Sequence, residues 1–132
     1  MSVEITWAAE LCVRLIRLYG VVNIEDVETM IEDNGVMLDA STQPLVHFVV
    51  DASAMTSITA NIVKMPAILN GIGNPKLGWV GIVGITPLIS FWVEILRRAV
   101  GLRFKLFPTV EDATEFMLEL VRIARDESQP LK

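Results

Sequence analysis

The sequence predicts an α/β domain with a mixed, mostly parallel sheet, an N-terminal hairpin and four helices. Three observations support this fold class. Nearly continuous apolar runs at residues 45–50 and 79–84 are typical of strands buried on both faces of a parallel sheet. Helical patterns alternate with strands in the order β-β-α-β-α-β-α-β-α, which implies right-handed crossover connections. The first two strands alternate apolar and polar side chains with period two.

The opening hairpin is predicted from residues 3–7 and 11–19, joined by a short turn. Period two places Cys12 on the face of the second strand opposite Val13. Gly20 is expected to end this strand, since glycine in a strand pattern marks an interruption.

The four helices are predicted from apolar periodicity and from their caps. Asn23 is the expected N-cap of a helix over residues 24–38, and Thr109 that of the last helix. Each is followed three residues later by an aspartate, in a capping-box arrangement. The two intervening helices are predicted over 59–69, where a proline forces a kink or an early end, and 87–100.

The length of 132 residues predicts one domain over 1–132, with a disordered polar tail after about residue 126. The apolar stretch 79–93 is interrupted by glycine and proline and falls short of the roughly twenty residues that a membrane span needs. A single cysteine excludes an internal disulfide, and residues 1–4 do not resemble a signal peptide. We therefore expect a cytoplasmic protein.

The net charge and the composition of the chain indicate which kinds of molecule it is expected to bind. A net charge of −5 argues against nucleic acid and against anionic membrane surfaces. Apolar residues make up 52% of the chain and charged residues 20%, which suggests that a partner covers some apolar surface. A homodimer is the simplest such assembly.

Three segments together resemble the STAS domain family, the SpoIIAA-like module of anti-sigma-factor antagonists. They are the strand ending in Asp51-Ala52-Ser53 within 46–58, the start of the next strand at 76–80, and the final strand and capped helix at 104–113. The resemblance extends over nearly the whole chain, and the closer likeness is to uncharacterised STAS-like and SpoIIAA-like bacterial proteins. It implies a STAS-like fold and an interaction or regulatory role.

The sequence departs from the pattern that STAS antagonists use for regulation. In that family a kinase phosphorylates a serine at the start of the helix after the central strand. The matching place here falls near Thr59, without the family's Asp-Ser pair or glycine. Thr59 could accept a phosphate at a helix N-terminus.

Two groups of residues are candidates for function. A polar loop after the central strand is a possible regulatory or ligand-binding loop, formed by Asp51, Ser53, Ser57 and Thr59. The alternative is that these side chains satisfy loop backbone groups and cap the following helix. Phe91 and Trp92 lie about 100° apart on one helix, so at least one is expected to face a partner, as a possible interface residue, or a ligand.

No pattern of residues points to catalysis, a cofactor or a metal. His47 lies in an apolar strand without a neighbouring His or Cys, so we expect a hydrogen-bonded core or interface residue. Cys12 is expected to be a buried small hydrophobe. Gly81 and Gly84 complete no phosphate-binding motif and more plausibly allow bending or close packing.

The sequence thus favours a non-catalytic STAS-like protein-interaction or regulatory domain that forms a homodimer. The alternative is a carrier or sensor of a small apolar ligand or lipid, of the Sec14-like type. That function would need a pocket lined by Met30, Met55, Met65 and the helix aromatics. An enzyme is the third possibility and is not expected, because acid–base and nucleophile pairs are missing.

Overall fold

The computed structural model describes residues 3–9, 12–58, 75–84, 94, 98 and 103–128. Their elements are β1 (Val3–Ala9), β2 (Val13–Val22), α1 (Ile24–Ala40), β3 (Val46–Ile58), β4 (Leu77–Val83), β5 (Phe104–Phe107) and α4 (Val110–Ser128). The helix predicted over 59–69 lies outside the described residues. So does the helix predicted over 87–100, apart from Glu94 and Arg98, where the backbone is helical.

The strands form one sheet in the order β1-β2-β3-β4-β5. β1 is antiparallel to β2, and every later pairing is parallel, which confirms the mixed sheet with an N-terminal hairpin. The amino ends of β2 to β5 therefore share one edge of the sheet, here called the amino edge: Val13, Val46, Leu77 and Phe104. Their carboxyl ends form the opposite, carboxyl edge, where Asp51 pairs with Val83 and β3 continues past β4.

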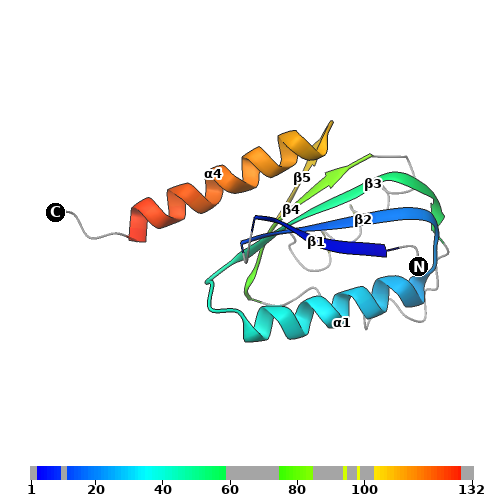
Figure 1. Cartoon of the computed structure of the whole chain (residues 1–132), viewed down its shortest axis with the longest axis horizontal. Helices are drawn as coiled ribbons and strands as arrows, with labels where there is room; N and C mark the ends of the chain where they lie inside the picture. Colours follow the sequence, from blue (N-terminus) through cyan, green and yellow to red (C-terminus); the bar gives the residue numbers. More distant parts are fainter. Residues whose placement is uncertain are drawn as a thin grey trace.

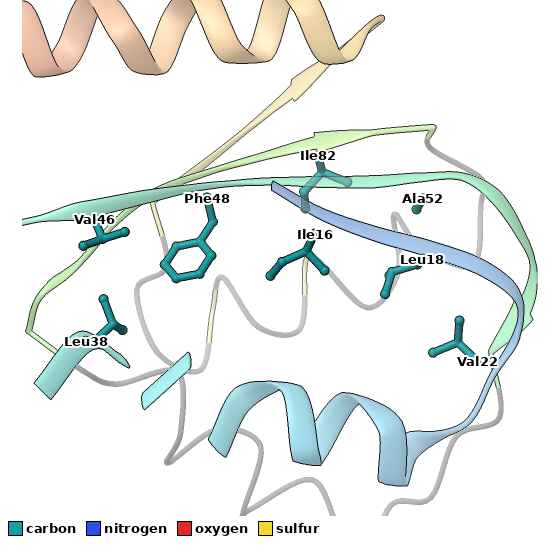
Figure 2. Close-up of a cluster of buried hydrophobic side chains, with 8 residues drawn as sticks. All are labelled: Ile16, Leu18, Val22, Leu38, Val46, Phe48, Ala52 and Ile82. Carbon is teal, nitrogen blue, oxygen red and sulfur yellow. The ribbon is translucent and has the colours of Figure 1, made fainter. Parts of the chain in front are cut away.

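Helices α1 and α4 lie on opposite faces of this sheet (Figure 1). On the α1 face, side chains of β2, β3 and β4 point toward the helix and form a buried cluster with Leu38 of α1 (Figure 2): Ile16, Leu18, Val22, Leu38, Val46, Phe48, Ala52 and Ile82. Strand alternation explains the choice of residues, since every second side chain of β3 faces the same way.

The second buried cluster lies between the sheet and α4: Cys12, Val13, Val49, Val83, Ala113 and Met117. Gly81 lets α4 approach, because a Cβ there would stand 3.0 Å from Met117 Cε and from the Phe107 ring. Cys12 is buried, as expected. Its predicted face is wrong, however. Cys12 packs in the same cluster as Val13 because it lies in the turn before β2, where strand alternation does not yet apply.

Two predicted boundaries are also wrong, and both concern the same region. Gly20 does not end β2: it adopts a φ of 64° and the strand continues to Val22. The segment predicted as a polar loop after Val50 is strand, since β3 runs through Ile58 and pairs with the extension of β2. Two register shifts in this pairing absorb the extra residues of β3 as bulges.

The predicted N-caps are confirmed. The Asp26 backbone N–H donates to Asn23 Oδ1 at 2.9 Å, and the Asp112 N–H donates to Thr109 Oγ1 at 3.1 Å. Each cap satisfies a backbone donor that the first helical turn leaves unpaired. Neither α1 nor α4 combines the length and apolar character needed to cross a membrane.

Candidate functional site

Asp51 is the centre of a polar cluster at the carboxyl edge. Its side chain is buried, and its Oδ1 accepts hydrogen bonds from the Ser53 backbone N–H at 3.0 Å and from the Ser53 hydroxyl at 2.5 Å. Its Oδ2 lies 3.5 Å from Nε of Arg17 on the neighbouring strand. Both carboxylate oxygens therefore have partners, and the cluster fixes the position of Ser53.

The same contacts set the pKa of Asp51. Burial alone would raise this pKa, but the two hydrogen bonds from Ser53 and the charge of Arg17 favour the ionised carboxylate more strongly. The pKa of Asp51 is consequently lowered. A carboxylate with a lowered pKa is a weak proton acceptor, so the geometry gives Asp51 an anchoring role.

Gly84 brings the chain after β4 against this cluster. It adopts a φ of 83°, and a Cβ at this position would lie 2.5 Å from the Cα and backbone nitrogen of Ser53. The predicted close packing at Gly84 is therefore confirmed, with Ser53 as the neighbour.

Past Leu18 and Asp51, β2 and β3 continue as a ribbon of two described strands. One of its faces packs in the α1-face cluster. The other, called the ribbon face below, carries Tyr19 and Val21 of β2 and Ser57 of β3, next to Arg17. Tyr19 is 39% exposed and Val21 is 61% exposed. Ser57 is exposed and pairs with Val21, whereas Thr59 lies outside the described residues.

A pocket of about 390 Å³ lies at the opposite, amino edge. Its walls come from the loop before β3, the first residues of β3 and β4, and the second half of α4, which extends past the amino ends of the strands (Figure 1). The apolar lining includes Pro44, Leu45, Trp79, Leu120, Val121 and Ile123; the polar lining includes Cys12, His47, Arg103 and Arg125.

His47 is held firmly in the wall of this pocket. It is 5% exposed, its backbone N–H donates to the Cys12 carbonyl at 3.0 Å, and its Nδ1 accepts from the Trp79 backbone N–H at 3.0 Å. Gly78 makes room for the ring, since a Cβ there would lie 2.3 Å from Nδ1. The prediction of a hydrogen-bonded core histidine is confirmed.

Burial lowers the pKa of His47, and the positive charge of Arg103 lowers it further. The imidazole is therefore neutral at neutral pH. Because Nδ1 accepts a hydrogen bond, the neutral ring carries its proton on Nε2. Nε2 has no hydrogen-bond partner among the described residues.

Two arginines and an aromatic side chain complete the pocket. Arg103 donates from Nη2 to the Leu77 carbonyl at 3.2 Å, and Nη2 of Arg125 lies 3.6 Å from Sγ of Cys12. The Trp79 indole is held edge-on by the Phe116 ring, with centroids 5.7 Å apart. The described lining contains two cationic side chains and no acidic one.

Sequence reasoning missed this pocket. A signal was available: Arg103 precedes the last strand and Arg125 is near the end of the last helix, so both come to the amino edge once a helix runs back along a parallel sheet. Met30 and Met55, predicted to line a ligand pocket, instead pack against the α1-face cluster. Met65, Phe91 and Trp92 lie outside the described residues.

Neither edge gathers a metal-binding set. Within 3–9, 12–58, 75–84, 94, 98 and 103–128, no group of three His, Cys, Asp or Glu side chains is placed to hold a metal ion.

Comparison with known proteins identifies the fold. No protein-family model matches the sequence, and no curated protein matches it. Among solved structures, the chain is similar to an uncharacterised DUF3478-family protein with a SpoIIAA-like fold from Shewanella loihica PV-4. The sequence identity is 17%, the TM-score is 0.61, and the match covers 87% of this chain and 91% of that one.

Two further matches are structures of SpoIIAA. The anti-sigma factor antagonist SpoIIAA in its unphosphorylated form is 14% identical, with a TM-score of 0.55 and coverage of 91% of this chain and 97% of that one. The Bacillus cell fate determinant SpoIIAA in its phosphorylated form is 12% identical, with a TM-score of 0.55 and coverage of 86% and 96%. The chain thus has the SpoIIAA-like fold that the sequence resemblance implied.

Proposed function

We propose that this chain is a non-catalytic protein-interaction domain that forms a homodimer through its ribbon face. The observation that carries this proposal is the exposure of two neighbouring large side chains, Tyr19 (39%) and Val21 (61%), on a strand whose other face is buried. Aromatic side chains are common anchors of protein interfaces. An apolar pair on an open sheet face is stabilised when a partner covers it.

The surroundings of this pair suit an interface. Arg17 and Ser57 supply polar groups beside the apolar pair, as the rim of an interface does. Arg17 forms an ion pair with Asp51 of the same chain. The charge of Arg17 therefore stays paired when a second copy of the chain covers it.

The fold supports a role in protein interaction. SpoIIAA, which shares the fold, is by its name an antagonist of an anti-sigma factor, and such an antagonist acts on another protein. The bonded state of the Asp51 carboxylate supports a non-catalytic role, because both of its oxygens are already engaged. A free, buried Cys12 supports a cytoplasmic location as part of the proposal.

The carboxyl edge also offers a regulatory switch within this proposal. A phosphate on Ser53 would add a charge of about −2 beside the Asp51 carboxylate and remove the hydroxyl proton that Asp51 accepts. The added charge would also compete for Arg17. SpoIIAA has been solved in both phosphorylated and unphosphorylated forms. Kinase treatment with mass mapping tests this part: phosphate on Ser53 or Ser57 supports it, and finding Ser53, Ser57 and Thr59 all unmodified excludes it.

Light scattering tests the dimer. The native chain is expected at twice its 14.6 kDa mass, and Val21→Lys should weaken the dimer at least tenfold by placing a charge in the apolar contact. Val36→Lys is the matched control, because Val36 is 72% exposed on α1, away from the ribbon face. A native chain that is monomeric at every concentration, or equal effects of the two variants, would overturn the proposal.

A second candidate function is a carrier or sensor of a small ligand, and the amino-edge pocket favours it. Its volume of about 390 Å³ falls in the range of small-molecule sites, about 300–1,000 Å³. Its apolar walls and convergent polar groups also match such sites. The two functions use opposite edges of the sheet and do not compete for residues.

A further inference from the structure

We propose that the amino-edge pocket binds a small organic anion with an apolar body, such as a medium-chain or aromatic monocarboxylate. This inference rests on the second candidate function and names its ligand class. It follows from the volume, the walls and the charges of the pocket.

The walls select for an apolar body. Leu45 from the loop before β3 and Leu120 and Val121 from α4 converge on one space, and Trp79 of β4 adds its indole. The indole is fixed by Phe116, so the space does not depend on a loose side chain. Filling it with an alkyl or aromatic group removes apolar surface from water on both partners.

The donors select for an anion. The neutral His47 ring carries its proton on Nε2, and this N–H has no acceptor among the described residues. Nδ1 and Cε1, the atoms beside Gly78, are packed against the chain. A carboxylate oxygen is the acceptor that would satisfy the remaining Nε2 proton.

The charged side chains that line the pocket also favour an anionic ligand. The chain carries a net charge of −5, yet Arg103 and Arg125 line the pocket and no described acidic side chain does. Glu119 and Asp126 of α4 are paired with Arg122 on the exposed side of the helix. The charged side chains in the described lining are therefore cationic, within a protein of net negative charge.

Two arginines that line the space favour a carboxylate as the polar group of the ligand. Arg103 precedes β5 and Arg125 belongs to the last turns of α4. A neutral lipid would offer no charged acceptor to Arg103 or to the Nε2 proton of His47, and an inorganic anion would leave the apolar walls uncovered. Octanoate combines the two features and is a suitable probe.

Calorimetric titration of the full-length chain with sodium octanoate, octan-1-ol and sodium acetate tests the proposal. Octanol has the alkyl chain without the charge, and acetate has the charge without the chain. We expect octanoate to bind at least tenfold more tightly than either, since hydrogen bonds to charged groups contribute that much or more. Equal affinity for octanoate and octanol, or no binding of octanoate and benzoate at millimolar concentration, would overturn it.

Variants locate the binding site. Arg103→Gln and Arg125→Gln are each expected to weaken octanoate binding about tenfold or more, and both positions are exposed enough to tolerate the change. Arg17→Gln removes the same charge at the opposite edge and should leave binding unchanged. An equal loss in Arg17→Gln would mean that net charge alone attracts the anion, which contradicts the proposal.

The failure of this inference can be told apart from failure of the dimer proposal. Val21→Lys should bind octanoate normally, and Arg103→Gln and Arg125→Gln should keep the oligomeric state of the native chain. Circular dichroism of each variant confirms that a lost affinity reflects the pocket and not the fold.

Discussion

The two edges of the sheet use polar groups in opposite ways. At the carboxyl edge, Asp51, Ser53 and Arg17 are bonded to one another, and the neighbouring ribbon face is open. At the amino edge, the Nε2 proton of His47 lacks a described acceptor, and the pocket beside it is lined by two arginines. Polar side chains that are hydrogen-bonded to one another hold a surface in one shape, whereas hydrogen-bond donors that line a pocket can bind a ligand.

This difference has a cause in the topology. Ligands of open α/β sheets usually bind at the carboxyl ends of the strands. Here α4 returns from the carboxyl end of β5 across the sheet and extends past the amino ends, where its last turns form a wall (Figure 1). The C-terminal helix therefore creates the described pocket at the edge where the general rule does not place one.

Each edge has a glycine that the packing requires, and the larger effect is expected at the carboxyl edge. Gly84→Ala would place a Cβ 2.5 Å from backbone atoms of Ser53, which cannot rotate away, and at a φ of 83°. We expect a loss of about 3 kcal/mol or more in the free energy of unfolding. Urea denaturation measures it, and a loss under about 1 kcal/mol would show that the cluster is not tightly packed.

Gly78→Ala should cost less, about 2 kcal/mol, because its Cβ would meet a side chain, the His47 ring, which can shift by giving up the hydrogen bond from the Trp79 N–H. The double variant Gly78→Ala with His47→Ala keeps the new Cβ but removes the ring that it would meet. Its destabilisation should be smaller than the sum of the single variants, and additive effects would mean that the two residues do not interact.

Asp51→Asn tests whether the carboxyl-edge bonds stabilise the fold. The variant should lose about 1–2 kcal/mol at neutral pH, because the ion pair with Arg17 and one strong acceptor disappear. The folded-state pKa of Asp51 is lowered, so its contribution is present above the ordinary pKa of 3.8 and is lost as the pH falls through the folded value. The native chain and the variant should therefore converge in stability at acid pH. A constant difference would assign the effect to packing.

Replacement of His47 should give the smallest change in the free energy of unfolding, and the change should depend on pH between about 7 and 5. Its folded-state pKa is lowered below 6.5, so the folded protein resists protonation and stability falls as the pH drops from about 6.5 toward the folded value. Among the described residues that line the same pocket, the charged side chains are Arg103 and Arg125, and arginine does not titrate in this range. His47→Gln should remove this slope between pH 7 and 5 in chemical denaturation. A slope that persists would belong to another group.

The succession of strands and helices and the two N-caps could be predicted from the sequence, because they depend on local patterns. The parallel pairing could be predicted because strands that alternate with helices are joined by crossover connections. Asn23 and Thr109 cap helices whatever lies across the sheet. The length of β3 could not be predicted in this way. Polar residues such as Ser53 and Thr56 are typical of loops, and here they belong to a strand because β2 extends beside them.

The pocket was beyond local reasoning for a similar reason. Cys12, His47 and Arg125 are far apart in sequence, and their meeting depends on where α4 crosses the sheet. His47 was correctly predicted to be a hydrogen-bonded residue from its apolar strand. The Trp79 N–H occupies Nδ1, so the proton is on Nε2, where it has no acceptor among the described residues. This assignment depends on a contact across the sheet.

The separation of the two edges is tested most directly by amide chemical-shift mapping of the full-length chain during titration with octanoate. The account predicts shifts that gather at the amino edge, on His47, Trp79 and the α4 residues Leu120 and Val121. The ribbon-face residues Tyr19, Val21 and Ser57 should stay unchanged. Shifts concentrated on the ribbon face, with an unchanged amino edge, would contradict it.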